Sequence, residues 1–427
     1  MNYQEARSFI DESLRYGGEV GLGKITRLLD YLDHPEKDLT FVHIAGTNGK
    51  GSVLSYVSTT LSMAGYRTGR YISPTLYSYE ERFQIDGQPI TKDEFVHYME
   101  VIVSAIEQME KDGYVCPSPF EIETVLSFLY FRDCKCDFVV IECGLGGLED
   151  ATNVIQNTAV AVLTSISLDH MDYLGDTLGA IAKTKSGIAK PGATVVTTYQ
   201  EPEAMDSIME TCHEQRCICV CADYRKARMI SSKVEEQIFL YDDCEWTLHL
   251  AGVCQVQNAV LAIEVLKALK ERGYALSLEQ MQAGLSATKW NGRFTIIHQN
   301  PTFIVDGAHN PDAAAKFAAS MKEYFDGKRI IYIIGVFKDK QYEDVVRLTI
   351  PFASEVIAIA TPNNPRALPA EELKQVVSRY MDHVTSASTI EEAVDKAFRM
   401  AGEDGVIASF GSLSFIGPIT EIVKNYT

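Results

Sequence analysis

The sequence has no uninterrupted apolar stretch of about 18 residues, the length that a membrane-spanning helix requires, so we expect no membrane partner. Its first residues, Met1 to Ser13, carry Glu5, Asp11 and Glu12 and have no apolar centre, which is unlike a secretory signal. Positive charge is also scarce: 39 Lys and Arg stand against 58 Asp and Glu, a formal net charge of −19 at pH 7. Nucleic-acid binding requires a basic surface, so we expect no such partner. Any anionic ligand must be held by a local basic site.

The ten cysteines form no C-x-x-C pair. Cys134 and Cys136, like Cys217, Cys219 and Cys221, follow C-x-C spacing on apolar, strand-like segments, and strand alternation would put the last three on one face. Without matching histidines this pattern favours buried, reduced thiols over a metal site. Reduced thiols in a chain with no export signal predict a cytoplasmic protein.

Length and hydrophobic patterning predict two α/β domains, since 427 residues exceed what a single core usually organises. Apolar strand-like runs alternate with helical stretches, which is typical of a parallel sheet covered on both faces. The expected strands are 41–45, 68–72, 138–142, 159–165 and 194–198, and the expected helices are 51–64, 94–109, 121–131 and 177–189. A β-like stretch at 229–250 leads into a helix at 255–270, and a second α/β series runs from 303 to 410. We place the domains at 1–296 and 297–427, with no low-complexity segment or repeat.

The most informative segment is the glycine-rich turn after the first predicted strand, Gly46-Thr47-Asn48-Gly49-Lys50-Gly51-Ser52. Glycines allow the backbone to approach a polyphosphate, its N–H groups and the next helix N-terminus attract anions, and Lys50 adds a full charge. The match to G-x-x-x-x-G-K-[ST] is imperfect, because Ile44 replaces the first glycine and Gly51 the hydroxyl residue. A plain Gly/Asn turn is the alternative.

Polar residues also follow other predicted strands, where α/β sheets place ligands. Glu142 ends an apolar strand before a glycine turn, and a charge there needs a partner such as a metal ion. Asp169 and His170 follow the next strand, although a lone histidine is more often a core residue than a Mg²⁺ ligand. Lys183 and Lys185, read alone, suggest solvated charges on a helix.

The glycine-rich turn at residues 46–52, called the nucleotide turn below, resembles that of folylpolyglutamate synthase and dihydrofolate synthase. These are members of the Mur ligase superfamily that use ATP to join an amino acid to a carboxylate. Further similar segments follow in the same order along nearly the whole chain: Ser73-Pro74, Asn258-Ala259, Trp290-Asn291-Gly292-Arg293, Asp306-Gly307-Ala308-His309-Asn310-Pro311 and Gly411-Ser412-Leu413. In isolation, 306–311 could be only a helix cap. The clearest departure is Leu148, where many relatives have arginine.

The resemblance implies a phosphate-loop mononucleotide-binding domain followed by a smaller Rossmann-like domain. It implies ATP contacts from Gly46, Thr47, Asn48, Gly49, Lys50, Gly51, Ser52, Asn258, Arg293 and Asp306. It implies Mg²⁺ ligands at Ser73, Glu142 and His170, and a CO₂-derived carbamate on Lys185. Catalytic roles fall to Lys50, Lys185, Asp306 and His309, and substrate contacts to Arg82, Asp150, His309 and Ser412.

The implied reaction adds L-glutamate to a folate or to dihydropteroate through an acyl phosphate made with ATP. Because the ATP and glutamate contacts lie in both halves, we expect the two domains of a monomer to close during the reaction. Two alternatives stay open. The acceptor could be a cell-wall nucleotide precursor, or the chain could be a nucleotide-dependent switch with no ligase activity.

Overall fold

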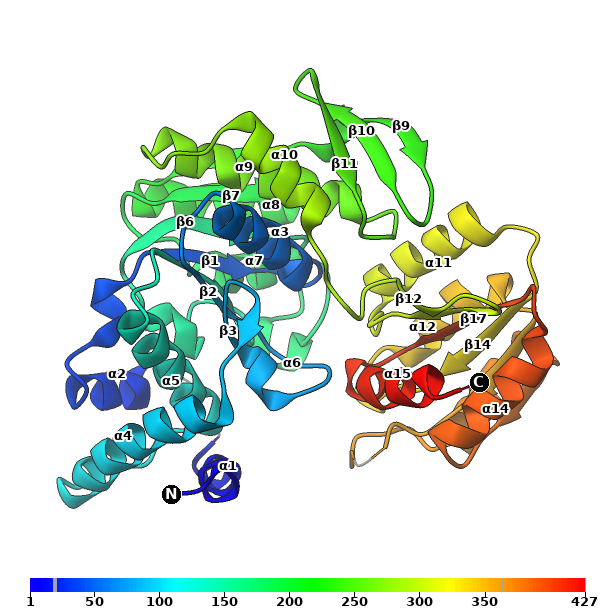
Figure 1. The fold of residues 1–427 in the computed structure, drawn as a ribbon, viewed down its shortest axis with the longest axis horizontal. Helices are drawn as coiled ribbons and strands as arrows, with labels where there is room; N and C mark the ends of the chain where they lie inside the picture. The colour runs from blue at the N-terminus through cyan, green and yellow to red at the C-terminus, as the bar shows by residue number, and fades with distance from the viewer. Residues whose placement is uncertain (18–20, 363, 427) are drawn as a thin grey trace. The chain divides into compact units, whose positions relative to one another are not determined.

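The computed structural model describes residues 1–17, 21–362 and 364–426. These residues form two compact units, each with its own sheet and helices (Figure 1). The first is built from 1–228, 241–246 and 257–288, and the second from 229–240, 247–256 and 289–427. Both units combine parallel strands with crossover helices, so the predicted α/β class is confirmed.

The sheet of the first unit has eight strands in the order β4-β3-β2-β5-β1-β6-β7-β8. The strands are β1 (Phe41–Ala45), β2 (Thr68–Tyr71), β3 (Phe83–Ile85), β4 (Gln88–Pro89), β5 (Phe138–Glu142), β6 (Thr158–Leu163), β7 (Thr194–Thr198) and β8 (Ile218–Ala222). All pair in parallel except β3 and β4, which are antiparallel. Helices on both faces bury β1, β5, β6 and β7 throughout, which explains their nearly continuous apolar sequences.

Two long helices of the first unit begin at recognisable caps. Thr91 caps α4 with a capping box, and Ser118 does the same for α5, which has proline at its first position. Helices α4 and α5 pack together with α1 and α2, whereas α3 packs on α10 (Figure 1). The bounds are α1 (Tyr3–Glu12), α2 (Gly23–Asp30), α3 (Lys50–Met63), α4 (Lys92–Lys111), α5 (Pro119–Asp133), α6 (Met171–Leu174), α7 (Leu178–Ser186), α8 (Pro202–Gln215), α9 (Gln255–Glu271) and α10 (Leu278–Ala287).

The predicted β-like stretch forms a three-stranded sheet in the order β11-β10-β9, made of β9 (Arg228–Ser232), β10 (Gln237–Tyr241) and β11 (Cys244–Leu248). The sheet of the second unit has the order β12-β13-β17-β14-β15-β16, parallel except for β12. Its strands are β12 (Thr295–His298), β13 (Thr302–Val305), β14 (Ile330–Ile334), β15 (Glu355–Ala358), β16 (Val384–Ser386) and β17 (Val406–Phe410). Its helices are α11 (Pro311–Phe325), α12 (Tyr342–Thr349), α13 (Ala370–Val377), α14 (Ile390–Ala401) and α15 (Ile416–Lys424).

The cysteines are free thiols, but the expectation that all of them are buried is wrong. Cys217 and Cys219 pack against an apolar cluster that contains Cys212, whereas Cys221 is exposed. The reason is that β8 is an edge strand of its sheet, so one of its two edges has no neighbouring strand. Among the described residues, every helix is too short or too polar to cross a bilayer.

Candidate active site

The glycine-rich turn joins the end of β1 to the first residue of α3. Two of its glycines, Gly46 and Gly49, are required by their backbone conformation and by close neighbours. Gly46 has φ +147°, and a Cβ atom there would lie 1.8 Å from Oγ1 of Thr164. Gly49 has φ +95°, and a Cβ atom there would lie 2.5 Å from Oδ1 of Asn258. Both turn positions therefore exclude side chains. Asn258, on α9, contacts the nucleotide turn itself, and its expected place beside adenine stays a prediction.

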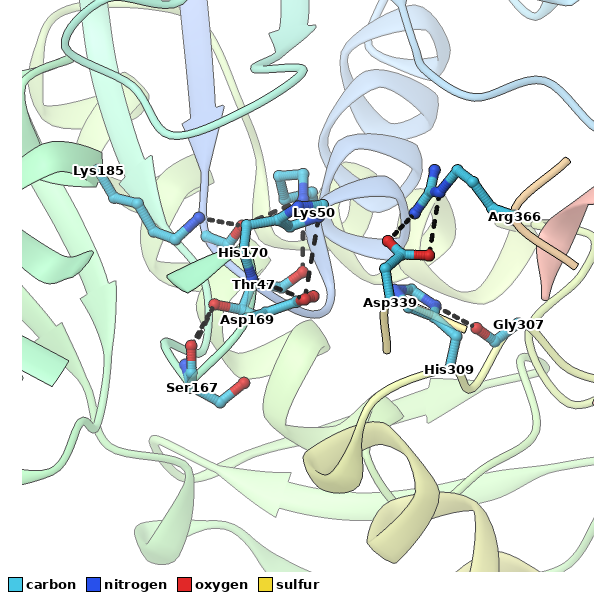
Figure 2. Close-up of polar contacts among 11 residues, drawn as sticks. Thr47, Lys50, Ser167, Asp169, His170, Lys185, Gly307, His309, Asp339 and Arg366 are labelled. Atoms are coloured by element: carbon cyan, nitrogen blue, oxygen red, sulfur yellow. Dashed lines mark hydrogen bonds and ion pairs between the residues drawn. The ribbon is translucent and has the colours of Figure 1, made fainter. Parts of the chain in front are cut away.

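Two lysine ammonium groups converge on this turn, and they donate to the same backbone oxygen (Figure 2). Lys50 Nζ lies 3.1 Å from the Gly46 carbonyl oxygen, and Lys185 Nζ lies 3.0 Å from it. Lys185 is on α7 and is only 5% exposed. Burial, followed by the charge of Lys50, lowers the pKa of Lys185 from its usual value to about 7. The alternative of a solvated surface charge is wrong for Lys185, but it holds for Lys183, whose side chain is 63% exposed.

The turn is also hydrogen-bonded to the segment that follows β6. The backbone N–H of Thr47 donates to the Ser165 carbonyl at 2.8 Å, and the N–H of Asn48 donates to the same oxygen at 3.3 Å. The Thr47 hydroxyl donates to the Ser167 carbonyl and accepts from the Ser167 N–H, both at 3.1 Å (Figure 2). The nucleotide turn and the segment leading to His170 therefore form one hydrogen-bonded structure. Sequence reasoning did not identify the two serines, because no local pattern marks them.

The residues expected to hold Mg²⁺ come from neighbouring strands, since β2, β5, β1 and β6 are adjacent in the sheet. Glu142 ends β5, is 4% exposed, and accepts the Ser73 N–H at 2.8 Å through Oε1. His170 has φ +52°, and its side chain is 41% exposed. Within the described parts of the chain, there is no group of three or more His, Cys, Asp or Glu that could hold a metal alone. One buried carboxylate with a hydroxyl fits Mg²⁺ that takes its remaining ligands from nucleotide phosphates and water.

Asp150 organises the glycine turn that follows Glu142. Its Oδ2 accepts the Leu145 N–H at 2.8 Å, and its Oδ1 accepts the N–H and hydroxyl of Thr152 at 3.0 and 2.5 Å. Burial raises the pKa of Asp150, and these hydrogen bonds oppose the shift. The backbone N–H of Leu148 donates to the Thr184 carbonyl at 2.8 Å, while the Leu148 side chain is 54% exposed. The turn is therefore fixed to α7 through its backbone, and the substrate role of Asp150 stays a prediction.

Arg82 lies in a buried network. Its Nη1 atom is 3.0 Å from Oε2 of Glu123, and the two side chains are 13% and 7% exposed. The Tyr79 hydroxyl donates to Glu123 at 2.5 Å, and the guanidinium of Arg7 stacks 3.3 Å from the centre of the Tyr79 ring. Burial raises the pKa of Glu123, and Arg82 opposes that shift. The charge of Arg82 is thus compensated inside the protein, and its substrate role stays a prediction.

In the second unit, the polar residues follow the adjacent strands β13 and β17. The Asp306 carboxylate accepts the backbone N–H groups of Phe294 and Ala308, each at 2.7 Å. Burial raises the pKa of Asp306, and the neighbouring Arg293 opposes this most strongly. The Nδ1 atom of His309 lies 2.8 Å from the Gly307 carbonyl oxygen (Figure 2).

Three further features of this unit bear on the predictions. Asn310 caps α11 through its side chain, so the helix-cap alternative applies to Asn310 but does not describe Asp306. Ser412 caps the turn after β17, and its hydroxyl oxygen accepts the Ser414 N–H at 3.3 Å. Arg366 pairs with Asp339, with 3.1 Å between Nε and Oδ1, on loops that follow β15 and β14 (Figure 2). Sequence reasoning had singled out neither member of this pair.

Comparisons with known proteins follow the same division of the chain. The family model of the Mur ligase middle domain matches residues 44–266, and that of the Mur ligase glutamate ligase domain matches residues 292–413. The chain is 33% identical over 434 residues to the dihydrofolate synthase/folylpolyglutamate synthase of Bacillus subtilis, covering 99% of each chain. It is 34% identical over 379 residues to the folylpolyglutamate synthase of Lacticaseibacillus casei, covering 86% of this chain and 88% of that one.

Solved structures agree. The Mycobacterium tuberculosis folylpolyglutamate synthase complexed with ADP and AMPPCP superposes with a TM-score of 0.88 at 29% identity, covering 100% of both chains. Escherichia coli FolC in complex with DHPP and ADP superposes with a TM-score of 0.87 at 27% identity, covering 99% of this chain and 98% of that one. The similarity therefore extends over both units and is not limited to the nucleotide turn.

Proposed function

Because this chain belongs to the Mur ligase family, and within it to the folylpolyglutamate and dihydrofolate synthases, we propose that it uses ATP to join L-glutamate to a folate-type carboxylate. The observation that carries the proposal is the convergence of Lys50 and Lys185 on the carbonyl oxygen of Gly46. A plain Gly/Asn turn gives no reason to place two amines together. A triphosphate and its developing charge require a cation such as Lys50, and the amine of Lys185, with its lowered pKa, is the one that the carbamate proposed below needs.

The chemistry follows from the need to activate a carboxylate in water. A carboxylate oxygen of the folate-type substrate attacks the γ-phosphorus of ATP, the bond to the bridging oxygen breaks, and ADP leaves. The amine of glutamate then attacks the carbonyl carbon of the acyl phosphate, phosphate leaves, and the nitrogen loses a proton. Lys50 and the N-terminus of α3 stabilise the charge on the transferring phosphoryl group, and we assign Arg293 to the same task.

Mg²⁺, when bound, would neutralise charge on the β and γ phosphates and would be held by Ser73, Glu142 and His170. The Ser73 N–H donates to the Glu142 carboxylate and thereby orients it. The hydrogen bonds between Thr47 and Ser167 keep the segment before His170 against the nucleotide turn. This arrangement supports the proposed ligand set because it brings ligands from separate strands to one edge of the sheet.

Lys185 is proposed to act as its carbamate. Its amine adds to the carbon of CO₂ and releases a proton, which converts a cation into an anion beside the nucleotide turn. The step requires a neutral amine, and the lowered pKa of Lys185 provides a substantial neutral fraction near pH 7. Asp169 lies close enough to affect this pKa, so the carbamate would stand beside the segment that carries His170.

We assign ATP binding to the domain at 1–296 and glutamate ligation to the domain at 297–427. In the second domain, Asp306 holds the backbone near Arg293, and His309 and Ser412 are proposed to contact the incoming glutamate. Arg82 and Asp150 are proposed to contact the folate-type substrate, each from a segment that its own hydrogen bonds and ion pairs hold in place. The free cysteines support an enzyme that works in the cytoplasm.

The decisive experiment measures ADP release with dihydropteroate or tetrahydrofolate as acceptor, each with and without L-glutamate. We expect release that depends strictly on both the acceptor and glutamate, and the preferred acceptor defines the substrate. Release that requires a cell-wall nucleotide precursor would assign the chain to another Mur ligase activity. ATP binding with no acceptor-dependent release would instead indicate a nucleotide switch.

A further inference from the structure

The side chain of Gln200 occupies a special position beyond the end of β7. Strands β6 and β7 pair in parallel up to Leu163 and Thr197, where the backbone ladder ends. The Gln200 side chain then continues it: Nε2 donates to the Thr164 carbonyl at 2.8 Å, and Oε1 accepts the Ile166 N–H at 3.0 Å. Nε2 also lies 3.2 Å from the Thr197 hydroxyl, and Gln200 is 5% exposed. A side-chain amide thus takes the place of a further residue of β7.

The opposite side of the same segment is held by the nucleotide turn. The Thr164 N–H donates to the Ala45 carbonyl at 2.9 Å, and the Ser165 hydroxyl donates to the Asn48 carbonyl at 3.2 Å. Together with the bonds from Thr47, these contacts place residues 164–167 between the nucleotide turn and Gln200. Asp169 and His170 follow this segment directly in the chain, so the position of residues 164–167 limits where these two side chains can lie.

We propose that Gln200 is a positioning residue for the ligase reaction, which keeps residues 164–167 in register with the nucleotide turn so that His170 meets the metal-bound nucleotide. The inference rests on the proposed function. The role of Gln200 follows from the backbone groups that it satisfies. Without the amide, the buried Ile166 N–H and Thr164 carbonyl lose their partners, and the segment lowers its free energy by moving toward water.

The chain provides a control for loss of an amide at the other end of the same strand, at a position that is exposed whereas Gln200 is buried. Asn157 directly precedes β6, and its Nδ2 donates to the Leu39 carbonyl at 2.9 Å. Like Gln200, it uses a side-chain amide to hold a backbone group of a neighbouring segment. It lies at the amino end of the strand, however, whereas the nucleotide turn and His170 lie at the carboxyl end. Loss of the Asn157 amide should lower stability without changing the ligand site.

The experiment compares the wild-type chain with Gln200→Met and Asn157→Leu, which keep side-chain size but remove the amide. Calorimetry measures ADP binding as a function of Mg²⁺ concentration, and hydrogen–deuterium exchange follows peptides covering 44–50 and 164–170. For Gln200→Met we expect the Mg²⁺ concentration for half-maximal ADP binding to rise on the order of 10-fold, as for other residues that orient metal ligands. We also expect faster exchange in both peptides, and neither change in Asn157→Leu.

Unchanged Mg²⁺ dependence and exchange in a folded Gln200→Met variant would overturn the role of Gln200, as would equal changes in both variants. If Gln200→Met does not fold, Gln200→Asn carries the same test, because it keeps a neutral amide but is one methylene too short to reach both the Thr164 carbonyl and the Ile166 N–H. The wild-type chain separates the two proposals. ADP release that depends on acceptor and glutamate supports the proposed function whatever Gln200 does, and a wild-type chain that binds no Mg–ADP overturns both.

Discussion

Two of the cationic side chains that the first unit shields from water, Lys185 and Arg82, are stabilised in opposite ways. Arg82 lies 3.0 Å from Glu123, and the Tyr79 hydroxyl donates to the same carboxylate. The Lys185 ammonium instead donates to the carbonyl oxygen of Gly46 and is repelled by the charge of Lys50. A buried ion pair needs both of its members, whereas a buried cation beside another cation is stabilised by losing its charge.

We call a charge structural when it only stabilises the fold, and chemical when its state can change during the reaction. Arg82 fits the first description and Lys185 fits the second. The Arg82 network can persist unchanged through a reaction cycle, because its carboxylate already satisfies the guanidinium. Lys185 lies beside the nucleotide turn with a pKa lowered to about 7, so its protonation can change near neutral pH, as the proposed carbamate requires. The comparison therefore predicts that variants at Lys185 impair chemistry and that variants in the Arg82 network impair folding.

The largest effect is expected for Lys185→Ala. Loss of the amine proposed to become the carbamate should lower turnover on the order of 10³-fold, a size seen when one preorganised charge-stabilising group is removed. The melting temperature should not fall, because a buried ammonium is removed with it. Steady-state kinetics and thermal denaturation check both parts, and acetate or formate should restore some activity by returning an anion to the vacated space.

Lys183→Ala is the matched control, because Lys183 lies on the same helix with an exposed side chain. It should behave as the wild-type chain in both measurements. An active Lys185→Ala variant, or equal losses at both lysines, would contradict the distinction between structural and chemical charge.

Lys50→Ala should lower turnover on the order of 10²-fold, because the variant lacks one charge on the transferring phosphoryl group. It should also raise the pKa of Lys185, since Lys50 is the largest electrostatic cause of that pKa's depression after burial. Kinetics test the first part, and the pH dependence of Lys185 modification by an amine-directed reagent tests the second. A variant with near-normal turnover would refute the assignment of the nucleotide turn.

Glu123→Leu tests the structural charge of Arg82, because it removes the carboxylate that pairs with the guanidinium. It leaves the Arg82 guanidinium buried without its carboxylate, which should lower the free energy of unfolding by about 3–5 kcal/mol. Denaturant unfolding measures this loss. The double variant Arg82→Met/Glu123→Leu should recover much of the stability, because no charge is then left unpaired. If the double variant is no more stable than Glu123→Leu, the charge pair is not the source of the loss.

The last effect concerns the pH dependence of stability. Because the pKa of Lys185 is lowered from 10.5 to about 7 in the folded state, the unfolded chain binds more protons between those values. Stability relative to Lys185→Met should therefore rise with pH from about 7 toward 10.5, by at most about 1.4 kcal/mol per pH unit. Denaturant unfolding in CO₂-free buffer, at several pH values, measures the difference. A flat difference would mean that Lys185 keeps its ordinary pKa in the folded state and stays protonated in both states over this range.

The sequence was sufficient for the central strands of the first sheet because their signals are local, whereas β3 and β4 were not predicted. The apolar runs at 41–45, 138–142 and 194–198 became β1, β5 and β7 with the predicted bounds, since strands buried on both faces read as continuous apolar segments. The nucleotide turn could be identified for a similar reason, because its glycines and lysine are consecutive in the chain.

The remaining features depend on partners far apart in sequence. Arg82 meets Glu123, and Gln200 meets Thr164 and Ile166, through packing that no short pattern encodes. Lys185 could be named only by resemblance, because helical periodicity does not reveal that its side chain points into the protein. The roles of His309, Ser412 and the predicted Mg²⁺ ligands stay predictions, since they depend on bound substrates.

The most direct test of the proposed carbamate on Lys185 is ¹³C NMR of the full chain with ¹³C-labelled bicarbonate and Mg–ADP. A carbamate on Lys185 predicts one protein carbamate resonance in the wild-type chain, its retention in Lys183→Ala, and its loss in Lys185→Ala. The absence of this resonance in the wild-type chain, or its persistence in Lys185→Ala, would contradict the account.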